Sequence, residues 1–213
     1  MPLLSLAYDL YVLDDHFLLR RKLLSRLKHS DQFSGARYGL FTAATCVRAG
    51  FELTYDDEDD RSQRHVEFRA VHKTSAQEIL VEAKQSVAAK NNYGKLINDA
   101  TKKVGSAPLV VFVDFNKSPE QARNYLRQGN RKIDQMLSRI SRSANGRDLF
   151  NLLVFTNHPY RFTTEANPYP EHLSLVIKAH NPLHIPKDGK LVARLERAVA
   201  QFGNIPKDFP EGC

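Results

Sequence analysis

Residues 79–85 read Ile-Leu-Val-Glu-Ala-Lys-Gln, and this stretch decides the fold. Its apolar beginning, residues 79–81, predicts a buried strand. Because side chains two residues apart share one face of a strand, Glu82 and Lys84 are expected to project side by side. Burying charged groups is costly unless they are paired or bind an ion. The pattern therefore predicts either a structural ion pair or a divalent metal site beside a catalytic lysine.

Two shorter strands are expected before this one. Residues 51–55 alternate apolar and polar side chains, and residues 66–72 do so again, with Glu67 on the face opposite Phe68. Residues 73–77 resemble a turn, so the strand at 66–72 is expected to pair antiparallel with the strand at 78–84. Opposite Cβ atoms of such a pair lie about 5 Å apart. A register that sets Glu67 opposite Glu82 would let one ion bridge their carboxylates.

The rest of the chain shows helical and strand patterns in turn. Apolar periodicity predicts helices over residues 14–28, 36–48, 91–104, 118–142 and 190–202. A polar break at 29–35 separates the first two of them. Fully apolar runs predict buried strands at 108–115, 151–155 and 173–179. From residue 36 the order is helix, three strands, helix, strand, helix, strand.

This order predicts an α/β protein of mixed α+β type, in which helices flank one central mixed sheet. The chain has 213 residues, a suitable length for one domain. We expect that domain to span residues 1–213. Its predicted parts are an N-terminal helical extension, a core and a closing helix, over 1–35, 36–180 and 190–203.

Charge is unevenly distributed along the chain, whose net charge is +7. Residues 1–60 contain 7 Lys and Arg against 10 Asp and Glu, a net of −3, which leaves 24 against 14, a net of +10, in residues 61–213. A basic surface indicates a polyanionic partner, most simply nucleic acid, although it also serves solubility. No apolar run approaches the about 20 residues of a membrane helix. We expect a cytoplasmic protein that does not bind membranes.

Arg123, Arg127 and Arg131 recur every four residues and would line one face of the helix predicted at 118–142. Such a stripe can contact the phosphates of nucleic acid, which would make binding strongly dependent on salt. The alternative is an ordinary solvated helix face.

Hydrolysis of a phosphodiester needs an activated water and neutralisation of charge at the phosphate. Mg²⁺ supplies both and prefers oxygen ligands, including one or two carboxylates. Glu67 and Glu82 could provide those carboxylates, and the carbonyl of Ala83 could provide a third oxygen. Lys84 could orient the attacking water or stabilise the pentavalent phosphate.

A helix, a hairpin with an acid, and an apolar strand ending in Glu-x-Lys resemble the PD-(D/E)xK nuclease superfamily, which has the restriction-endonuclease-like fold. The resemblance covers roughly residues 36–115 as core. It implies that Mg²⁺ (or Mn²⁺) binds to Glu67 and Glu82, that Lys84 is catalytic and that Gln85 assists. It also implies a nucleic-acid substrate, with DNA expected, and a homodimer would fit a double-strand cutter.

The chain departs from this family at two positions. The hairpin acid is Glu67 after Val66, where the family usually has Asp, often after Pro. Gly39 stands about where many members carry a glutamate on the first core helix. Three outcomes are open: a one-metal site, an acid supplied by Asp31 or Glu52, or an inactive protein that serves as a nucleic-acid-binding or protein-interaction module.

Overall fold

A computed structural model of the chain describes residues 2–55, 66–86, 93–102, 107–118, 120–121, 123–124, 134–135, 137–139, 149–158, 173–178 and 190–200. The helices are α1 (Pro2–Val12), α2 (Phe17–Leu27), α3 (Ser30–Arg48), α4 (Tyr93–Thr101) and α6 (Leu191–Ala200). The strands are β1 (Phe51–Thr54), β2 (Phe68–His72), β3 (Glu78–Gln85), β4 (Leu109–Asp114), β5 (Leu152–Asn157) and β6 (Leu173–Lys178).

All six strands form one mixed sheet in the order β1-β2-β3-β4-β5-β6. The pairs β1–β2, β2–β3 and β5–β6 are antiparallel, whereas β3–β4 and β4–β5 are parallel. The stretch at 79–85 thus becomes β3, the strand that joins an antiparallel hairpin to a parallel half-sheet. The predicted mixed sheet flanked by helices is confirmed, including the antiparallel pairing of β2 with β3.

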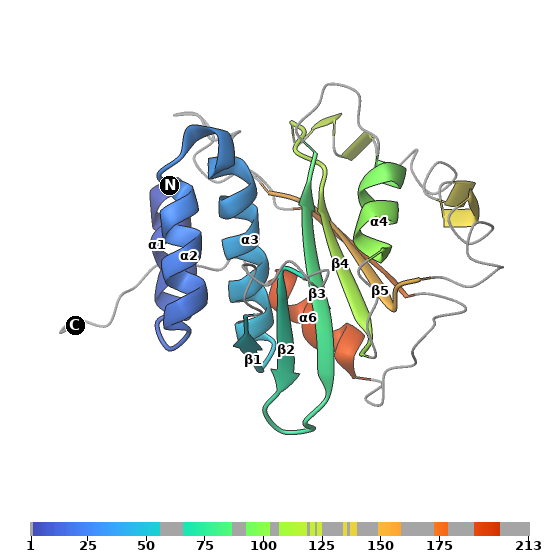
Figure 1. Cartoon of the computed structure of the whole chain (residues 1–213). Coiled ribbons are helices and arrows are strands. Elements are labelled where there is room, and N and C mark those ends of the chain that lie inside the picture. Colours follow the sequence, from blue (N-terminus) through green and yellow to red (C-terminus); the bar gives the residue numbers. More distant parts are fainter. Residues whose placement is uncertain are drawn as a thin grey trace.

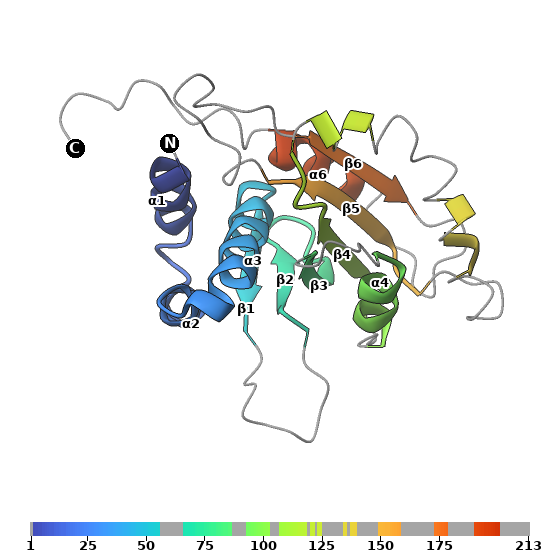
Figure 2. The ribbon, with the colours of Figure 1, turned by 90° about the horizontal axis from the view of Figure 1, so that it is seen from above.

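Helices cover both faces of this sheet (Figures 1 and 2). Seen from above, α3 and α6 lie against one face, α4 lies against the other, and α1 and α2 form an outer layer over α3. The core is divided accordingly. Val81 of β3 and Phe112 of β4 pack in a cluster with α3 and α6, whereas Leu80 of β3 and Val111 of β4 pack in a cluster with α4. Consecutive residues of β3 therefore face different helices.

Helix α3 starts earlier than the sequence predicted. The polar stretch at 29–35 is predicted to lie between two helices, but α3 begins at Ser30, with Asp31 in its first turn. An acidic residue there interacts favourably with the positive end of the helix dipole. From Ser34 to Cys46 nearly every side chain of α3 is buried, because the sheet covers one side and α1 and α2 cover the other. The predicted boundary between residues 35 and 36 therefore falls inside a helix.

A buried ion cluster attaches α1 to α3. Asp9 is 0% exposed, and its carboxylate lies 2.7 Å from Nη1 of Arg37 and 3.1 Å from Nη1 of Arg48. Arg37 is 1% exposed and also donates to Oγ of Ser5 at 2.7 Å.

Within the described residues, no helix combines the length and apolar character needed to cross a bilayer.

Replacing Asp9 with Asn should therefore destabilise the protein strongly. Removing one partner of a buried ion pair leaves an uncompensated charge and costs about 3–5 kcal/mol. Equilibrium unfolding in urea measures this cost. Asp14→Asn is the matched control, because the Asp14 side chain is 71% exposed where it pairs with Arg20, and a surface pair contributes at most about 1 kcal/mol. Equal losses in both variants would contradict the anchoring role of Asp9.

Candidate active site

Among the described residues, β3 continues past the point where its pairing with β2 stops, and we call this part of the strand its open end. The β2–β3 register runs only to Phe68↔Val81, whereas the β3–β4 register continues to Gln85↔Asp114. Beyond β2, the backbone N–H of Glu67 still donates to the carbonyl of Val81 at 3.1 Å. Backbone groups two residues apart on a strand point to the same side. The carbonyl of Ala83 therefore points to the same side as that of Val81, toward the position that β2 would occupy if it continued.

Glu82 and Lys84 lie together, as the sequence predicted. Nζ of Lys84 is 2.9 Å from Oε2 of Glu82. The Glu82 side chain is 0% exposed and that of Lys84 is 25% exposed. Because they alternate with Val81 and Ala83, which pack on the α3 side, they face the α4 side. The ion pair expected as the simpler alternative exists, and it compensates a carboxylate that would otherwise be costly to bury.

The charge of Lys84 reaches α4. The pKa of Asp99 on α4 is lowered, first by its hydrogen bond from Lys102 and then, among weaker electrostatic influences, by the positive charge of Lys84. Nζ of Lys102 lies 2.7 Å from Oδ1 of Asp99. The positive charge of Lys84 thus acts on a carboxylate of α4 as well as on Glu82.

Glu67 points in another direction. It occupies a bend before β2, and the predicted alternation breaks there, because Val66 packs on the α4 side and Phe68 on the α3 side. Its carboxylate lies 3.1 Å from Nη1 of Arg26 on α2. The nearby Arg69 pairs with Glu78 at 3.2 Å. The structure does not bring Glu67 to Glu82, so an ion bridging the two carboxylates stays a prediction.

Gly39 faces the Glu67 carboxylate. A Cβ atom built at Gly39 would lie 3.3 Å from Oε1 of Glu67 and 3.4 Å from Cδ2 of Leu23. Gly39, which stands about where many PD-(D/E)xK proteins carry a glutamate, is thus adjacent in space to Glu67. Asp31 and Glu52, the alternative acids, are exposed in the first turn of α3 and on β1.

A buried polar layer on the α3 side was not predicted. Oδ2 of Asp114 accepts a hydrogen bond from Nε2 of Gln85 at 2.8 Å, and Oδ1 accepts one from the backbone N–H of His158 at 2.8 Å. Gln85 is also hydrogen-bonded to Ser34. Tyr38 is hydrogen-bonded to Thr156 at 2.8 Å. We call Ser34, Tyr38, Gln85, Asp114, Thr156 and His158 the polar layer.

The polar layer gathers at the carboxyl ends of the parallel strands β3, β4 and β5. In open α/β sheets this edge is where ligands bind. One sequence signal could have revealed this layer. Asp114 interrupts the apolar run at 108–115 near its end, and Thr156 directly follows the run at 151–155. Within this layer Gln85, for which the family resemblance implies an assisting role, is hydrogen-bonded at the end of β3.

The remaining predicted residues lie elsewhere. Arg123 is helical and exposed, while Arg127 and Arg131 lie outside the described residues. In the part of the chain that the structure describes, no group of three or more His, Cys, Asp or Glu side chains is placed to hold a metal ion. No protein-family model, curated protein or solved structure matches the chain.

Tyr38 should make stability sensitive to alkaline pH. Burial, and then the charge of Asp114, raise the pKa of Tyr38 well above its usual value, against the lowering effect of the Thr156 hydrogen bond. Above pH ~10 the unfolded chain releases a phenol proton that the folded protein retains, so the free energy of unfolding falls as pH rises.

Tyr38→Phe should therefore lose stability less steeply above pH ~10, by about 1.4 kcal/mol per pH unit at most. Unfolding in urea at several pH values measures the slope. Tyr11→Phe, at a tyrosine that is 77% exposed, controls for removal of a phenol. Identical alkaline slopes for wild type and Tyr38→Phe would show that this phenol does not control the effect.

Proposed function

We propose that the protein is a metal-dependent nuclease that hydrolyses phosphodiester bonds in nucleic acid, with DNA as its substrate. One observation carries the proposal: the buried carboxylate of Glu82 lies 2.9 Å from the ammonium of Lys84 at the open end of the central strand. Metal-assisted hydrolysis uses a carboxylate to hold the ion and a cation to stabilise charge on the phosphate. The order of elements and the Glu-x-Lys sequence of the PD-(D/E)xK family add support.

Each proposed residue has a role that follows from its position. A bound Mg²⁺ or Mn²⁺ would activate a water and neutralise charge at the scissile phosphate. Glu82 and the carbonyl of Ala83 would offer oxygen ligands beside the open edge. Lys84, which is 25% exposed, would turn from Glu82 to donate a hydrogen bond to the phosphate or the attacking water. Gln85, held by Asp114, would keep the end of β3 in position.

The donor set suits a hydrated ion better than a closed protein cage. Mg²⁺ usually keeps several waters and takes one or two carboxylates, together with phosphate oxygens of the substrate. Glu82 meets the minimum of one carboxylate. Glu67 would become the second if its 3.1 Å contact with Arg26 opened and its side chain turned toward β3. Glu82 would therefore be the first ligand of the ion, and Glu67 would be recruited together with the metal.

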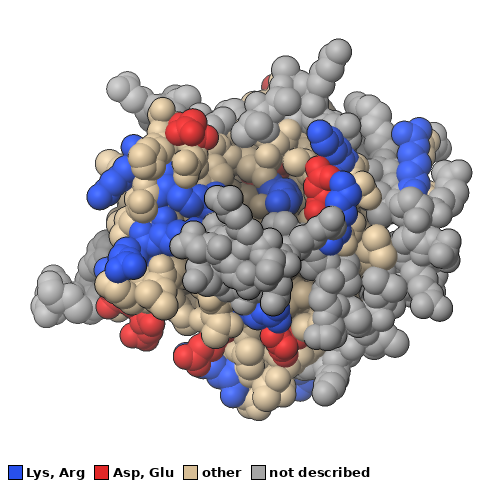
Figure 3. Space-filling model, viewed as in Figure 1, with Lys and Arg blue, Asp and Glu red and all other residues tan. Residues whose placement is uncertain are grey.

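Basic side chains on α2, on the α3 side of the sheet, add support for a polyanionic substrate. Helix α2 contains Arg20, Arg21, Lys22 and Arg26 and no acid. Figure 3 shows Lys and Arg gathered over the side of the molecule where α2 lies. Arg26 connects this helix directly to Glu67. A phosphate backbone passing along α2 would be attracted to these cations and would come close to Glu67.

A second candidate function is a nuclease-like fold without catalysis that binds nucleic acid or a protein partner. The Arg26–Glu67 contact favours it, because a guanidinium here occupies the place next to the hairpin acid. Gly39 favours it too, since it faces the same carboxylate without contributing a ligand. The Glu82–Lys84 ion pair would then have only a structural role.

Cleavage assays separate the two candidates. Wild-type protein should cut single- or double-stranded DNA with Mg²⁺ or Mn²⁺, and chelation should stop the reaction. Glu82→Gln and Lys84→Gln should each slow cleavage on the order of 10²–10³-fold, because they remove the metal ligand and the stabilising cation. Glu78→Ala is the matched control, because Glu78 lies on the same strand but pairs with Arg69.

Two results would count against the proposed activity. Wild-type protein that cleaves no substrate with either metal would favour the binding module. Cleavage that persists unchanged in Glu82→Gln and Lys84→Gln would place the active site elsewhere or indicate a contaminating nuclease.

Arg26→Ala tests whether Glu67 can join the site. Removing the guanidinium frees the Glu67 carboxylate, so Mn²⁺ should bind several-fold more tightly than in wild type, as measured by calorimetry. The cost in stability should be at most about 1 kcal/mol, because the side chain is 30% exposed. Arg21→Ala, an exposed position on the same helix, should leave Mn²⁺ affinity unchanged. An unchanged affinity in Arg26→Ala would remove Glu67 from the proposed ligands.

A further inference from the structure

The outer face of α1 carries an apolar stripe. Leu3, Ala7 and Tyr11 are exposed and four residues apart, so they line one side of the helix over about 12 Å. Leu3 is 80% exposed and Tyr11 is 77% exposed. Leu4 and Leu10, each three residues from Ala7 and half-buried, border this line. We call these five residues the α1 stripe. An apolar face of this kind, unlike an isolated exposed residue, marks an interaction surface.

Exposed apolar side chains are concentrated in this part of the protein. Among the described residues, the exposed large apolar side chains all lie within residues 3–33, namely Leu3, Tyr11, Phe17, Leu18 and Phe33. Helix α1 lies on the outside of the molecule, away from the sheet, in both ribbon views (Figures 1 and 2). The apolar surface is therefore a local property of the outer helical layer.

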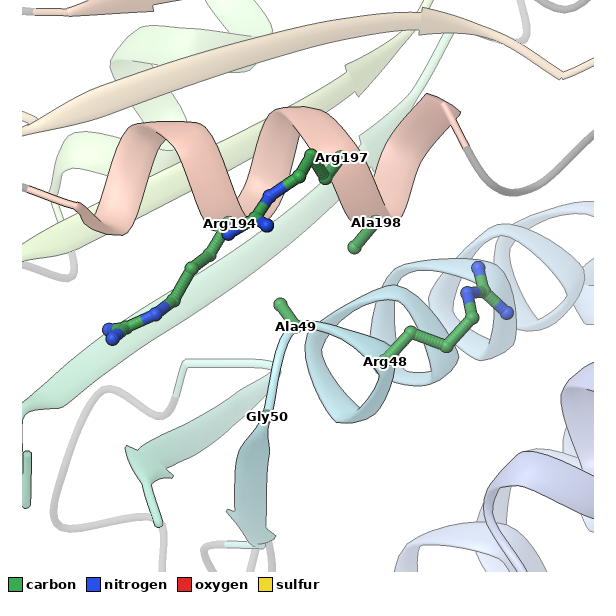
Figure 4. Close-up of a pocket in the computed structure, with 6 residues that line it drawn as sticks. All are labelled: Arg48, Ala49, Gly50, Arg194, Arg197 and Ala198. Atoms are coloured by element: carbon green, nitrogen blue, oxygen red, sulfur yellow. The ribbon is translucent and has the colours of Figure 1, made fainter. Parts of the chain in front are cut away.

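The inner face of α1 fixes the direction in which the stripe points. Ser5 and Asp9 are buried there, and positions two residues apart on a helix are about 200° apart around its axis. Figure 4 shows the Arg48 side chain extending away from the labelled arginines of α6, and its guanidinium lies 3.1 Å from the Asp9 carboxylate. Asp9 is the one charged residue in the sequence of α1, and it faces inward. The outward face of α1 therefore has no charged side chain.

Helix stability is the alternative explanation of this composition. Alanine and leucine are strong helix formers, so they would stabilise α1 without any partner. Lysine, glutamate and arginine rank almost as high, however, and they are the usual choice for a face in contact with water. Tyr11 is a weaker helix former than any of these. Helix propensity therefore does not explain why the exposed face lacks charge.

The α1 stripe is complementary to itself when two copies of the helix run antiparallel. With Ala7 opposite Ala7 of a second copy, Leu3 of each copy lies opposite Tyr11 of the other. Leu4 then lies opposite Leu10 in the same way. The small side chain of Ala7 at the centre allows the helix axes to approach to about 8 Å. Each residue of the stripe thus gains an apolar partner, as a closed twofold contact requires.

Charges near the ends of α1 favour the same antiparallel arrangement. Asp14 and Asp15 are exposed just beyond the last residue of α1, where the negative end of the helix dipole disfavours carboxylates. The first turn of α1 contains no acidic residue, and its backbone N–H groups form the positive end of the dipole. An antiparallel partner brings unlike ends together. Asp14 pairs with Arg20 of its own chain, so Asp15 is expected to contribute more.

We propose that the α1 stripe binds the α1 stripe of a second copy of this chain, antiparallel, with a twofold axis at Ala7. A helix contact about 12 Å long belongs to the small class of interfaces, so self-association is expected at micromolar or higher concentrations. The inference is independent of the proposed nuclease activity, because no residue assigned to metal binding or catalysis belongs to α1.

Sedimentation equilibrium tests the dimer between about 1 and about 300 µM, a range that brackets small interfaces. Wild-type protein should shift from the monomer mass of 24.2 kDa toward twice that mass. Ala7→Lys should associate at least ten-fold more weakly, because two ammonium groups would face each other across the axis. Ala193→Lys, at an exposed alanine of α6, is the matched control and should associate as wild type does.

Oppositely charged variants test the antiparallel register. Ala7→Glu should also associate at least ten-fold more weakly than wild type. An equimolar mixture of Ala7→Lys and Ala7→Glu should form a heterodimer that added salt weakens, because unlike charges then meet at the axis. Recovered association also shows that both variants are folded. Asp15→Asn should weaken wild-type association several-fold by removing the contact with the positive end of the partner helix.

Three results would overturn the proposal. The first is wild-type protein that stays monomeric over the whole concentration range. The second is a dimer that Ala7→Lys leaves undiminished, and the third is a mixture of the two charged variants that does not associate. Monomeric wild-type protein that sediments with vesicles of anionic phospholipid would assign the α1 stripe to a lipid surface instead.

Discussion

Burial of β3 on both faces is the constraint on which the rest of the structure depends. Helices α3 and α6 cover one face and α4 covers the other, so the side chains from Ile79 to Glu82 are buried in a protein interior. Leu80 and Val81 satisfy this condition by being apolar. Glu82 cannot, and a buried carboxylate without compensation costs several kcal/mol. The 2.9 Å contact with Lys84 meets that cost, and it places an acid and a base together at a strand end.

The unequal lengths of β2 and β3 turn this ion pair into a candidate site. Pairing with β2 stops at Val81, while pairing with β4 continues to Gln85. At this one edge, two polar groupings approach from opposite faces of the sheet. Glu82 and Lys84 face α4, and Gln85 joins Asp114 in the polar layer below α3. The proposed chemistry is thus placed where the sheet can present charged side chains and backbone carbonyls without disrupting its core.

The sequence predicted the features that depend on residues close together in the chain, namely the buried strands and the shared face of Glu82 and Lys84. The apolar runs became β3, β4 and β5, and Glu82 and Lys84 share a face because strand periodicity requires it. The alternation predicted through Val66, Glu67 and Phe68 was wrong, because the chain bends at Glu67 and its two neighbours pack on different sides of the sheet. The polar layer could not be predicted by periodicity, since it joins Ser34 to Gln85 and Tyr38 to Thr156, residues far apart in the chain.

The proposed function requires the buried carboxylate of Glu82 to belong to a metal site. A crystal structure of the protein grown with millimolar Mn²⁺, with anomalous scattering data, tests it most directly. We expect a Mn²⁺ ion at a coordination distance of about 2.1 Å from a Glu82 oxygen, with Lys84 turned away from the carboxylate. A structure in which Lys84 still contacts Glu82, with no ion at the end of β3, would contradict the account.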